Sequence, residues 1–365
     1  MKPKILFLMH LPPPIHGAAV VGKNIYESKL INNEFDCKYI NLSASSEVKE
    51  VGKLGFKKVL FLFSSVFTVC ITVLTEKPDL CYVTPSSWDW GFYRDFVIVM
   101  LLKLFRCKVV VHFHNKGVDA WTNRPFNKLL YKLFFKNAKV ILLSEELYAE
   151  KQPYVKRSDL YLCPNGIVKT NNGNILNEIE NKTVRFLFLS NMMEEKGVWI
   201  LLDACRVLKE KGYSFICDFV GKWSDISEID FNIKVENYNL TNVIRAHGSQ
   251  YGAAKNTFFQ NANIFVFPTY YHGEAFPMVL LEAMEFGLPC ISTFEGGIPS
   301  IVLDGVTGVL IKQKNVFELT QAMSYMIENP KILKEMGVSG QKIFLEKFTF
   351  ETFEKNFITI LKDCI

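Results

Sequence analysis

Short apolar runs alternate with longer helical patterns along the whole chain. In the first half the predicted strands are Ile5–Met9, Cys81–Val83, Val109–Phe113 and Val140–Leu143, with a helical pattern over Ala18–Leu30 after the first. In the second half they are Phe186–Leu189, Phe215–Val220, Ile264–Phe267 and Cys290–Thr293. Such alternation is typical of a parallel sheet covered by helices. The pattern therefore predicts an α/β protein whose ligands bind beyond the carboxyl ends of the strands.

A polar stretch separates the two series. It runs over Lys169–Lys182 and is the best linker in the chain. A length of 365 residues also favours two domains, because domains usually have ~100–200 residues. We therefore predict an N-terminal Rossmann-like domain over 1–168, a linker over 169–181, a C-terminal Rossmann-like domain over 182–345, and a C-terminal helix over 346–365 that returns to the N-terminal domain.

Composition and charge exclude several classes of protein. Hydrophobic residues make up 49% and charged residues 22%, which is typical of a folded protein with sizeable cores. The net charge of +5 is too small and too dispersed for a nucleic-acid-binding protein, but suits anionic small molecules or an anionic membrane surface. The nine cysteines are scattered and contain no Cys-x-x-Cys pair, so we expect reduced, buried thiols in a cytoplasmic protein.

Two apolar segments bear on the relation to membranes. The first, Ile5–Met9, is too short for the apolar part of a signal peptide and predicts a strand. The second, Val59–Leu74, follows Lys53, Lys57 and Lys58, but its sixteen residues fall short of the ~20 that a spanning helix needs. It predicts a helix that is either buried against the first sheet or lies on the membrane surface.

The strongest motif lies after the predicted strand Ile264–Phe267. Glu274 lies in a loop, Pro277 is placed for a first helical turn, and Gly287 ends that helix, so Glu282 lies about one turn inside it. A helix start offers free amides and a partial positive charge, which suits a diphosphate. The two carboxylates could accept hydrogen bonds from sugar and ribose hydroxyls, or they could simply be solvated charges.

This segment resembles the Glu-x7-Glu motif of family 4 retaining glycosyltransferases with the GT-B fold. The Leu-Glu-Ala-Met and Gly-Leu-Pro sequences match as well, as do Pro164-Asn165-Gly166-Ile167 and the glycine-rich block from Glu295 to Gly308. The resemblance implies two Rossmann-like domains with parallel sheets facing across a cleft, the donor in the second and the acceptor in the first. It also implies that Glu274 holds the donor sugar, that Glu282 holds the ribose, and that Phe276, Pro277 and Met278 lie against the donor.

The loop after the predicted strand Phe186–Leu189 carries the next candidates. In the family this loop usually supplies an Arg and a Lys that neutralise the donor diphosphate. Lys196 aligns with that Lys, whereas Asn191 stands where the Arg is expected. Because Asn donates hydrogen bonds but carries no charge, either another cation compensates or the leaving group relies on Lys196 and helix dipoles.

In the first half, two loops follow predicted strands. Gly17 and Ala18 align with the family's N-terminal glycine loop, which closes over the donor phosphates, and His16 borders the acceptor. His114 aligns with the family histidine near the reacting sugar, which is thought to hold its hydroxymethyl group, and Asn115 is assigned to the acceptor side. Without the resemblance, a lone histidine is more often a packing residue.

The sequence leads to the hypothesis of a retaining, metal-independent glycosyltransferase that moves a sugar from a UDP- or GDP-sugar to a sugar hydroxyl. The sequence contains no Asp-x-Asp pair, P-loop, nucleophile elbow or zinc spacing, so we expect no metal and no cofactor. His114, Lys196 and Glu274 are the candidate catalytic residues. The preferred acceptor is a lipid-linked intermediate of bacterial surface polysaccharide at the inner face of the membrane. A sugar-nucleotide epimerase and an inactive transferase-like scaffold are the alternatives.

Overall fold

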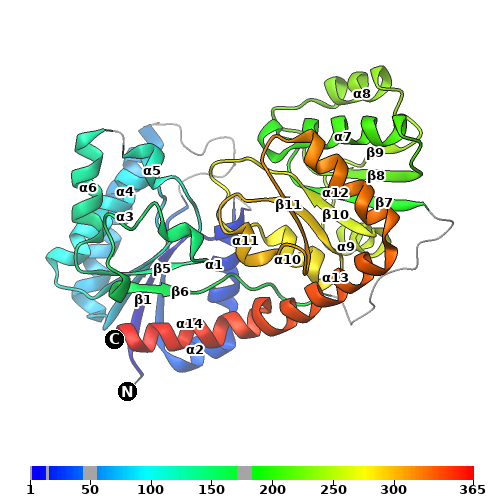
Figure 1. Cartoon of the computed structure of the whole chain (residues 1–365). Helices are drawn as coiled ribbons and strands as arrows, with labels where there is room; N and C mark the ends of the chain where they lie inside the picture. Colours follow the sequence, from blue (N-terminus) through cyan, green and yellow to red (C-terminus); the bar gives the residue numbers. More distant parts are fainter. Residues whose placement is uncertain (1, 14–15, 44–55, 123, 171–182) are drawn as a thin grey trace. The chain divides into compact units, whose positions relative to one another are not determined.

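The computed structural model describes residues 2–13, 16–43, 56–122, 124–170 and 183–365. The chain divides into two compact units, one made of Met1–Asn165 with Glu351–Ile365 and the other of Gly166–Phe350 (Figure 1). From residue 171 onward, the linker expected over 169–181 lies outside the described residues. Each unit contains one six-stranded sheet, and the strand pairings within both sheets are parallel.

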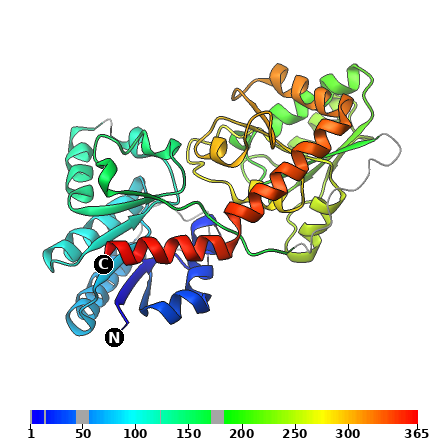
Figure 2. The same ribbon diagram turned by 60° about the horizontal axis from the view of Figure 1, so that its bottom comes forward.

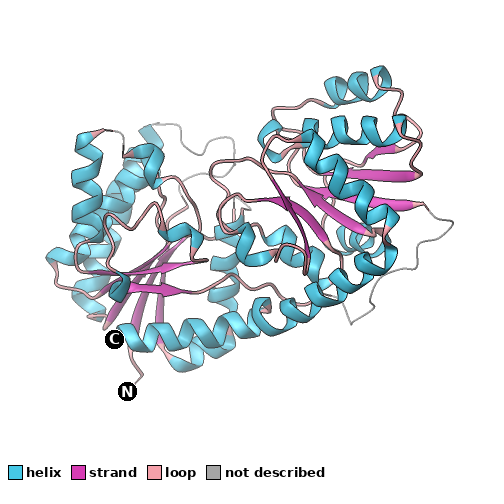
Figure 3. Ribbon diagram, viewed as in Figure 1, coloured by secondary structure: helices cyan, strands magenta, loops and turns pink. Residues whose placement is uncertain are grey.

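The first sheet has the order β2-β1-β3-β4-β5-β6. Its strands are β1 (Lys4–Met9), β2 (Asp36–Asn41), β3 (Leu80–Val83), β4 (Val109–His112), β5 (Ala138–Leu142) and β6 (Leu160–Leu162). The helices of this unit are α1 (Gly17–Glu27), α2 (Lys29–Glu34), α3 (Phe56–Glu76), α4 (Asp89–Leu104), α5 (Val118–Trp121), α6 (Pro125–Phe135) and α14 (Phe350–Cys364). The central strands β3 and β4 are buried throughout, because helices cover both faces of the sheet (Figure 3).

Helices α3, α4 and α6 lie alongside one another on one face of this sheet (Figure 1). Helix α3 connects β2 to β3, α4 connects β3 to β4, and α6 connects β4 to β5. Each connection moves toward the β6 edge of the sheet. Because crossovers between parallel strands are right-handed, connections that move the same way place their helices on the same face. The C-terminal helix α14 covers the opposite face, where the Phe357 ring packs within 6.5 Å of the Phe7 ring and 5.1 Å of the Tyr82 ring (Figure 2).

The second sheet has the order β12-β11-β10-β7-β8-β9. Its strands are β7 (Val184–Leu189), β8 (Phe215–Val220), β9 (Ile244–Ala246), β10 (Ile264–Phe267), β11 (Cys290–Thr293) and β12 (Gly308–Ile311). The helices are α7 (Val198–Glu210), α8 (Glu228–Asn237), α9 (Gly252–Asn261), α10 (Met278–Glu285), α11 (Ile298–Ile301), α12 (Val316–Glu328) and α13 (Pro330–Ile343). The strand order turns at β7 and β10, and in such sheets ligands bind beyond the carboxyl ends of the strands at that turning point.

The eight strands predicted from apolar runs are confirmed, and the predicted α/β class is correct. Four strands were missed, namely β2, β6, β9 and β12, because they are edge or near-edge strands with polar or short sequences. The helix predicted over Ala18–Leu30 is wrong at its end. Ser28 leaves the helical conformation, and its hydroxyl accepts a hydrogen bond from the Ile31 amide, so the chain restarts as α2.

The apolar segment Val59–Leu74 forms part of α3 and divides into two faces. Val69 and Val73 are buried, whereas Leu60, Phe63, Phe67, Ile71 and Leu74 are exposed. The basic residues that lead into it, Lys53, Lys57 and Lys58, lie outside the residues whose side chains the structure describes. Within the described ranges, no helix combines the length and the apolar character needed to cross a membrane.

All nine cysteines are free thiols. Six of them, Cys81, Cys163, Cys205, Cys217, Cys290 and Cys364, are buried, and the other three are partly exposed. The expectation of buried thiols therefore holds for most of them, and the physical reason is that they occupy apolar strands and helix faces where a thiol packs as a small hydrophobic group.

Candidate active site

The loop after β7 brings Lys196 to the carboxyl end of the second sheet. Residues Glu194–Lys196 form one 3-10 turn, and Gly197 then adopts φ = 86° and begins α7. A Cβ at position 197 would lie 2.3 Å from the carbonyl oxygen of Pro268, so only glycine lets this loop approach the end of β10 so closely. The Glu195 carbonyl also accepts a hydrogen bond from the Tyr270 amide at 2.8 Å.

Lys196 and Glu274 form an ion pair at this junction. The Nζ atom of Lys196 lies 2.5 Å from Oε2 of Glu274, and both side chains are close to nine-tenths buried, with exposed fractions of 13% and 12%. The same ammonium lies 4.3 Å from the centre of the Tyr271 ring, within cation–π distance. Burial and the neighbouring Glu274 carboxylate raise the pKa of the Tyr271 phenol, so it stays protonated.

The backbone around Glu274 is fixed by the glycine-rich loop after β11. The Gly297 amide donates to the Ala275 carbonyl at 2.7 Å. Gly296 has φ = 53°, and a Cβ there would lie 2.0 Å from the Glu274 carbonyl oxygen. Gly296 therefore has a structural task, which is to let the two loops touch through their backbones.

The start of α10 is open at its amino end. Pro277 is the N-cap residue, one position before the first turn in which the sequence placed it, and Met278 is the first helical residue. Within the part of the chain that the structure describes, no side-chain cap bonds the first amides. Phe276 is buried, and its ring packs 5.9 Å from that of Phe348, so its side chain belongs to the core of the unit. Any donor contact of Phe276 would have to come from its backbone. The helix ends at Glu285, and its C-cap residue Phe286 is followed by Gly287 with φ = 71°, as expected for a glycine stop.

Glu282, inside α10, has a partner that the sequence did not indicate. Lys255 on α9 lies 2.7 Å away, from Nζ to Oε1, and both side chains are one-quarter exposed. Burial raises the pKa of the Glu282 carboxyl, and the Lys255 ammonium opposes that rise. No motif in the sequence marks Lys255, because a lysine at a helical position is common.

Asn191 lies at the start of the loop after β7 and its side chain is exposed. Its carbonyl accepts a hydrogen bond from the Met193 amide at 2.8 Å. The side chain therefore brings an amide, without charge, to the position where a cation was expected. Among the residues described here, Lys196 and Lys255 are the cations paired with the two carboxylates of the Glu-x7-Glu spacing.

In the first unit, His16, Gly17 and Ala18 form the start of α1. His16 is the N-cap residue, and its Nδ1 atom accepts a hydrogen bond from the Ala19 amide at 3.3 Å. The other edge of the imidazole lies near His10, with the ring centres 5.8 Å apart. Burial lowers the pKa of His16, so the ring is neutral and can act as the cap acceptor near pH 7.

His114 lies just beyond the carboxyl end of β4. Its ring packs against that of His112 at 4.1 Å, and the buried Asn165 of the Pro-Asn-Gly sequence lies beside it. Burial lowers the pKa of His114 to about 4. Among the described residues, neither ring nitrogen of His114 has a hydrogen-bond partner. His114 is therefore a neutral imidazole near pH 7, suited to hydrogen bonding and poor as a cation.

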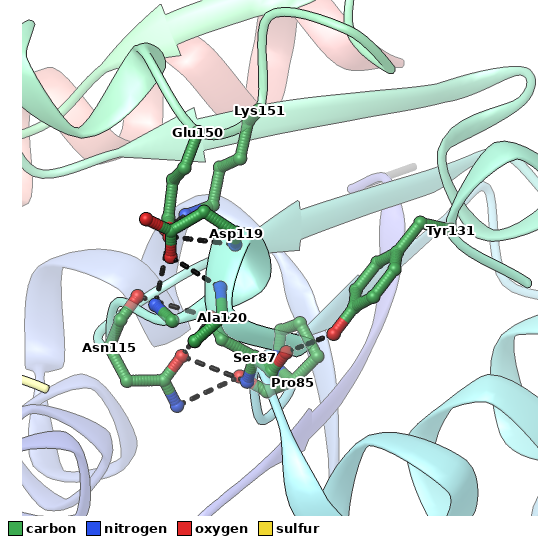
Figure 4. A network of polar contacts seen from close by, with 9 residues as sticks. Pro85, Ser87, Asn115, Asp119, Ala120, Tyr131, Glu150 and Lys151 are labelled. Carbon is green, nitrogen blue, oxygen red and sulfur yellow. Dashed lines mark hydrogen bonds and ion pairs between the residues drawn. The ribbon is translucent and has the colours of Figure 1, made fainter. Parts of the chain in front are cut away.

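Asn115 is engaged within the chain (Figure 4). Its Oδ1 atom accepts hydrogen bonds from the Ser87 amide and hydroxyl, and its Nδ2 atom donates to the Pro85 carbonyl at 3.4 Å. The side chain thus ties the loop after β4 to the loop after β3. The polar atoms of Asn115 are thus used for support, and its place on the acceptor side stays a prediction.

Arg94 is a further residue that sequence inspection missed. It lies on α4, is buried, and its Nε donates to Asp95 at 2.7 Å while Nη1 donates to the Leu42 carbonyl at 2.6 Å. Its Nη2 atom lies 3.5 Å from Nε2 of His10. These contacts join the loops after β1 and β2, because a buried guanidinium needs several acceptors at once.

The described residues contain no group of three or more His, Cys, Asp or Glu side chains arranged to hold a metal ion. The loops after β7 and β10, helix α9 and the first turns of α10 together provide two cations, two carboxylates and the first amides of α10. Such a set can bind the phosphates and hydroxyls of a nucleotide sugar.

Comparison with known proteins agrees with this chemistry. Residues 174–343 match the family model described as glycosyl transferases group 1, a range that includes Lys196, Lys255, Glu274 and Glu282. The structure of HepE from Anabaena in complex with UDP and glucose has a TM-score of 0.71 over 99% of this chain and 100% of that one, at 18% identity. The fold is GT-B. The predicted fold class is therefore confirmed.

Several curated relatives of this GT-B chain are glycosyltransferases of polysaccharide biosynthesis. It is 26% identical over 201 residues to the capsular polysaccharide biosynthesis glycosyltransferase CapM of Staphylococcus aureus, covering 51% of each chain. It is 24% identical over 215 residues to the amylovoran biosynthesis glycosyltransferase AmsK of Erwinia amylovora, covering 57% of this chain and 52% of that one. The matched regions thus span about half the length of these relatives.

Proposed function

We propose that this protein is a retaining, metal-independent glycosyltransferase of family 4. It transfers a sugar from a UDP- or GDP-sugar to a sugar hydroxyl on a lipid-linked intermediate of bacterial surface polysaccharide. The observation that carries the proposal is the pair Lys196–Glu274 at the start of α10, within the range that matches group 1 glycosyl transferases. The relatives CapM and AmsK support the polysaccharide context.

In this mechanism the second unit binds the donor. The Lys196 ammonium and the first amides of α10 stabilise the negative charge that develops on the departing diphosphate. Glu274 accepts hydrogen bonds from donor sugar hydroxyls, and Glu282 accepts them from the ribose. These carboxylates are suited to the task because ionised oxygens accept hydrogen bonds from hydroxyl groups more strongly than neutral acceptors do.

The first unit supplies the acceptor side. His114 donates or accepts a hydrogen bond as a neutral imidazole, and Asn115 acts by holding its loop. In a retaining transfer with front-face attack, the departing phosphate helps to remove the acceptor proton, so no side-chain base is assigned. Gly17 and Ala18 contribute the amino end of α1, near His16, as a further source of backbone amides.

We further propose that α3 places this protein on the cytoplasmic face of an anionic membrane. Its exposed row of Leu60, Phe63, Phe67, Ile71 and Leu74 is unusual for the outer face of a helix. A second exposed row, Phe126, Leu129 and Leu133, lies on α6 on the same side of the sheet, next to exposed Lys128, Lys132 and Lys136. Apolar rows bordered by lysines suit the interface of an anionic bilayer.

A nucleotide panel and a donor panel test the transferase proposal. Thermal shifts with UDP, GDP, ADP and CMP should single out UDP or GDP, because only the nucleotide of the true donor stabilises the folded protein. With the matching nucleotide sugars, the protein should release nucleotide slowly by hydrolysis with retention at the anomeric carbon. Isomerised nucleotide sugar would instead identify an epimerase, and neither binding nor hydrolysis would identify an inactive scaffold.

A further inference from the structure

Aromatic side chains gather in the segments that follow β3 and β4 of the first unit. Three of the five tryptophans of the chain, Trp88, Trp90 and Trp121, lie here. The Tyr93 ring links two of them, with ring centres 6.4 Å from Trp90 and 6.4 Å from Trp121. These segments lie at the carboxyl edge of a parallel sheet, where α/β proteins bind ligands.

Trp88 is the most exposed of the three. Its side chain is 43% exposed, whereas large aromatic residues usually bury most of their surface. The pyrrole edge of its indole lies against Gly117, which has φ = 125° and where a Cβ would lie 2.9 Å from Cδ1 of Trp88. The absence of a side chain at position 117 therefore lets the indole rest on the backbone of the loop that carries His114.

Polar contacts fix the two loops that carry Trp88 and Gly117, and Figure 4 shows this network. Ser87, the residue before it, is fixed by Asn115 and by the Tyr131 hydroxyl, which donates to the Ser87 carbonyl. On the other side, the Gly117 amide donates to Oε2 of Glu150 at 2.9 Å, and Glu150 is paired with the fully buried Lys151. A buried polar network of this kind fixes the conformation of both loops.

The segments that carry Trp88 and Gly117 also hold polar groups. Lys116 and Asp119 lie in the same loop as Gly117. The buried indole N–H of Trp121 has no hydrogen-bond partner among the described residues, so water or a ligand hydroxyl is needed to satisfy it. A pyranose has the complementary chemistry, because it presents an apolar face of C–H groups and a rim of hydroxyls.

We propose that Trp88, supported by Gly117, is a stacking platform for a sugar ring of the acceptor. The proposal rests on the proposed function, since it assigns the acceptor subsite of that reaction. A rigid aromatic side chain contributes a large apolar contact at little cost in conformational entropy, which suits a weak ligand such as a sugar. Trp88 touches the bound acceptor and takes no part in binding the nucleotide.

Saturation-transfer NMR on the full chain tests this assignment. The probes are the methyl glycosides of β-glucose, β-galactose, N-acetyl-β-glucosamine and α-rhamnose, and UDP and GDP are titrated in parallel. The wild type should transfer saturation to the C–H protons on one face of at least one glycoside. Trp88→Ala should weaken its affinity by about tenfold and Trp88→Phe by less than about threefold, because phenylalanine keeps a stacking face.

Two further variants make the result specific. Gly117→Ala should weaken glycoside binding without any change to the Trp88 residue itself, because the new methyl group displaces the indole. Phe317→Ala, which removes an aromatic side chain that is 68% exposed on α12, should change nothing. Circular dichroism spectra of each variant, compared with that of the wild type, should show that the variant is folded.

The results distinguish failure of the Trp88 stacking platform from failure of the proposed transferase function. Equal glycoside affinity for the wild type and Trp88→Ala, or no saturation transfer to any of the four glycosides, would overturn the platform. Loss of UDP and GDP binding together with glycoside binding in Trp88→Ala would show that the residue supports the whole structure and refute a local role. Glycoside binding by a wild type that binds neither nucleotide would refute the proposed transferase while retaining the platform.

Discussion

The ammonium of Lys196 lies 2.5 Å from a carboxylate oxygen of Glu274, and both side chains are largely buried. The two residues come from loops after different strands, β7 and β10. The cation proposed for the diphosphate therefore neutralises the carboxylate proposed for the sugar. Removing either one leaves the other as an unpaired, partly buried charge, so the two variants should differ in how they affect nucleotide binding.

Glu274→Ala should lose most of the turnover while still binding UDP or GDP. The sugar loses its hydrogen-bond acceptor, whereas the freed Lys196 remains available to the phosphates. Turnover with the natural donor and calorimetric nucleotide titration check the two halves of this prediction. Glu335→Ala, an exposed helix position, is the matched control. Wild-type turnover in Glu274→Ala would contradict the role.

Lys196→Ala should cost about 2–4 kcal/mol of transition-state stabilisation, the range seen for a single electrostatic donor. The expected loss in kcat/KM is large because the charge acts in a partly desolvated site. Lys331→Ala, which removes a lysine that is 90% exposed, serves as the control and should keep full activity. If kcat/KM fell less than threefold, other groups would carry the diphosphate charge.

Lys255→Met should make nucleotide binding more sensitive to acid. Burial already raises the pKa of Glu282 and Lys255 counteracts the rise, so removing Lys255 lifts that pKa further. Ribose binding needs the ionised carboxylate, so affinity is present at high pH and is lost as pH falls through the Glu282 pKa. The loss should therefore begin at higher pH in the variant. UDP or GDP titrations between pH 4.5 and 8 measure it, and superimposable profiles would refute the coupling.

Activity should persist in EDTA. The cations proposed for the diphosphate are side chains and helix amides, which a chelator does not remove. Initial rates with and without EDTA, followed by addition of Mg²⁺ or Mn²⁺, provide the measurement. Loss of activity in EDTA with recovery on adding metal would show that a metal ion stabilises the leaving group.

Replacing Phe63 and Phe67 by Ser should reduce sedimentation with vesicles of phosphatidylglycerol and phosphatidylethanolamine. Both side chains are about two-thirds exposed, so the change should leave the fold stable. Lys57→Glu with Lys58→Glu should act in the same direction, as should high salt, because each lysine near anionic lipid adds about 1 kcal/mol.

The matched control for the membrane prediction is Phe317→Ser, an equally exposed phenylalanine in the second unit. It should bind vesicles as the wild type does. If no form of the protein sediments with vesicles, the apolar row on α3 has another purpose, and the lipid-linked character of the acceptor loses its support.

The local pattern of the sequence determined the alternating architecture. Apolar runs such as Ile264–Phe267 are buried on both faces of a parallel sheet, and this requirement leaves a continuous hydrophobic stretch in the sequence. The helix from Met278 to Glu285 was equally predictable, because Pro277 and Gly287 have backbone preferences that act within a few residues. Edge strands such as β9 escaped detection since only one side of them is paired and their residues are partly polar.

The sequence also indicated which side chains could bind a nucleotide sugar, through residue types at fixed spacing in the loops that follow strands. Only the tertiary structure decided their partners. Lys196 and Glu274 are separated by 78 residues, and Lys255 and Glu282 by 27, so their pairing depends on how β7, α9, β10 and α10 pack together. The same is true of Trp88 and Gly117, which touch because β3 and β4 are neighbours in the sheet. Spacing along a chain specifies local conformation, whereas contacts between distant residues arise from the packing of whole elements, which no short pattern encodes.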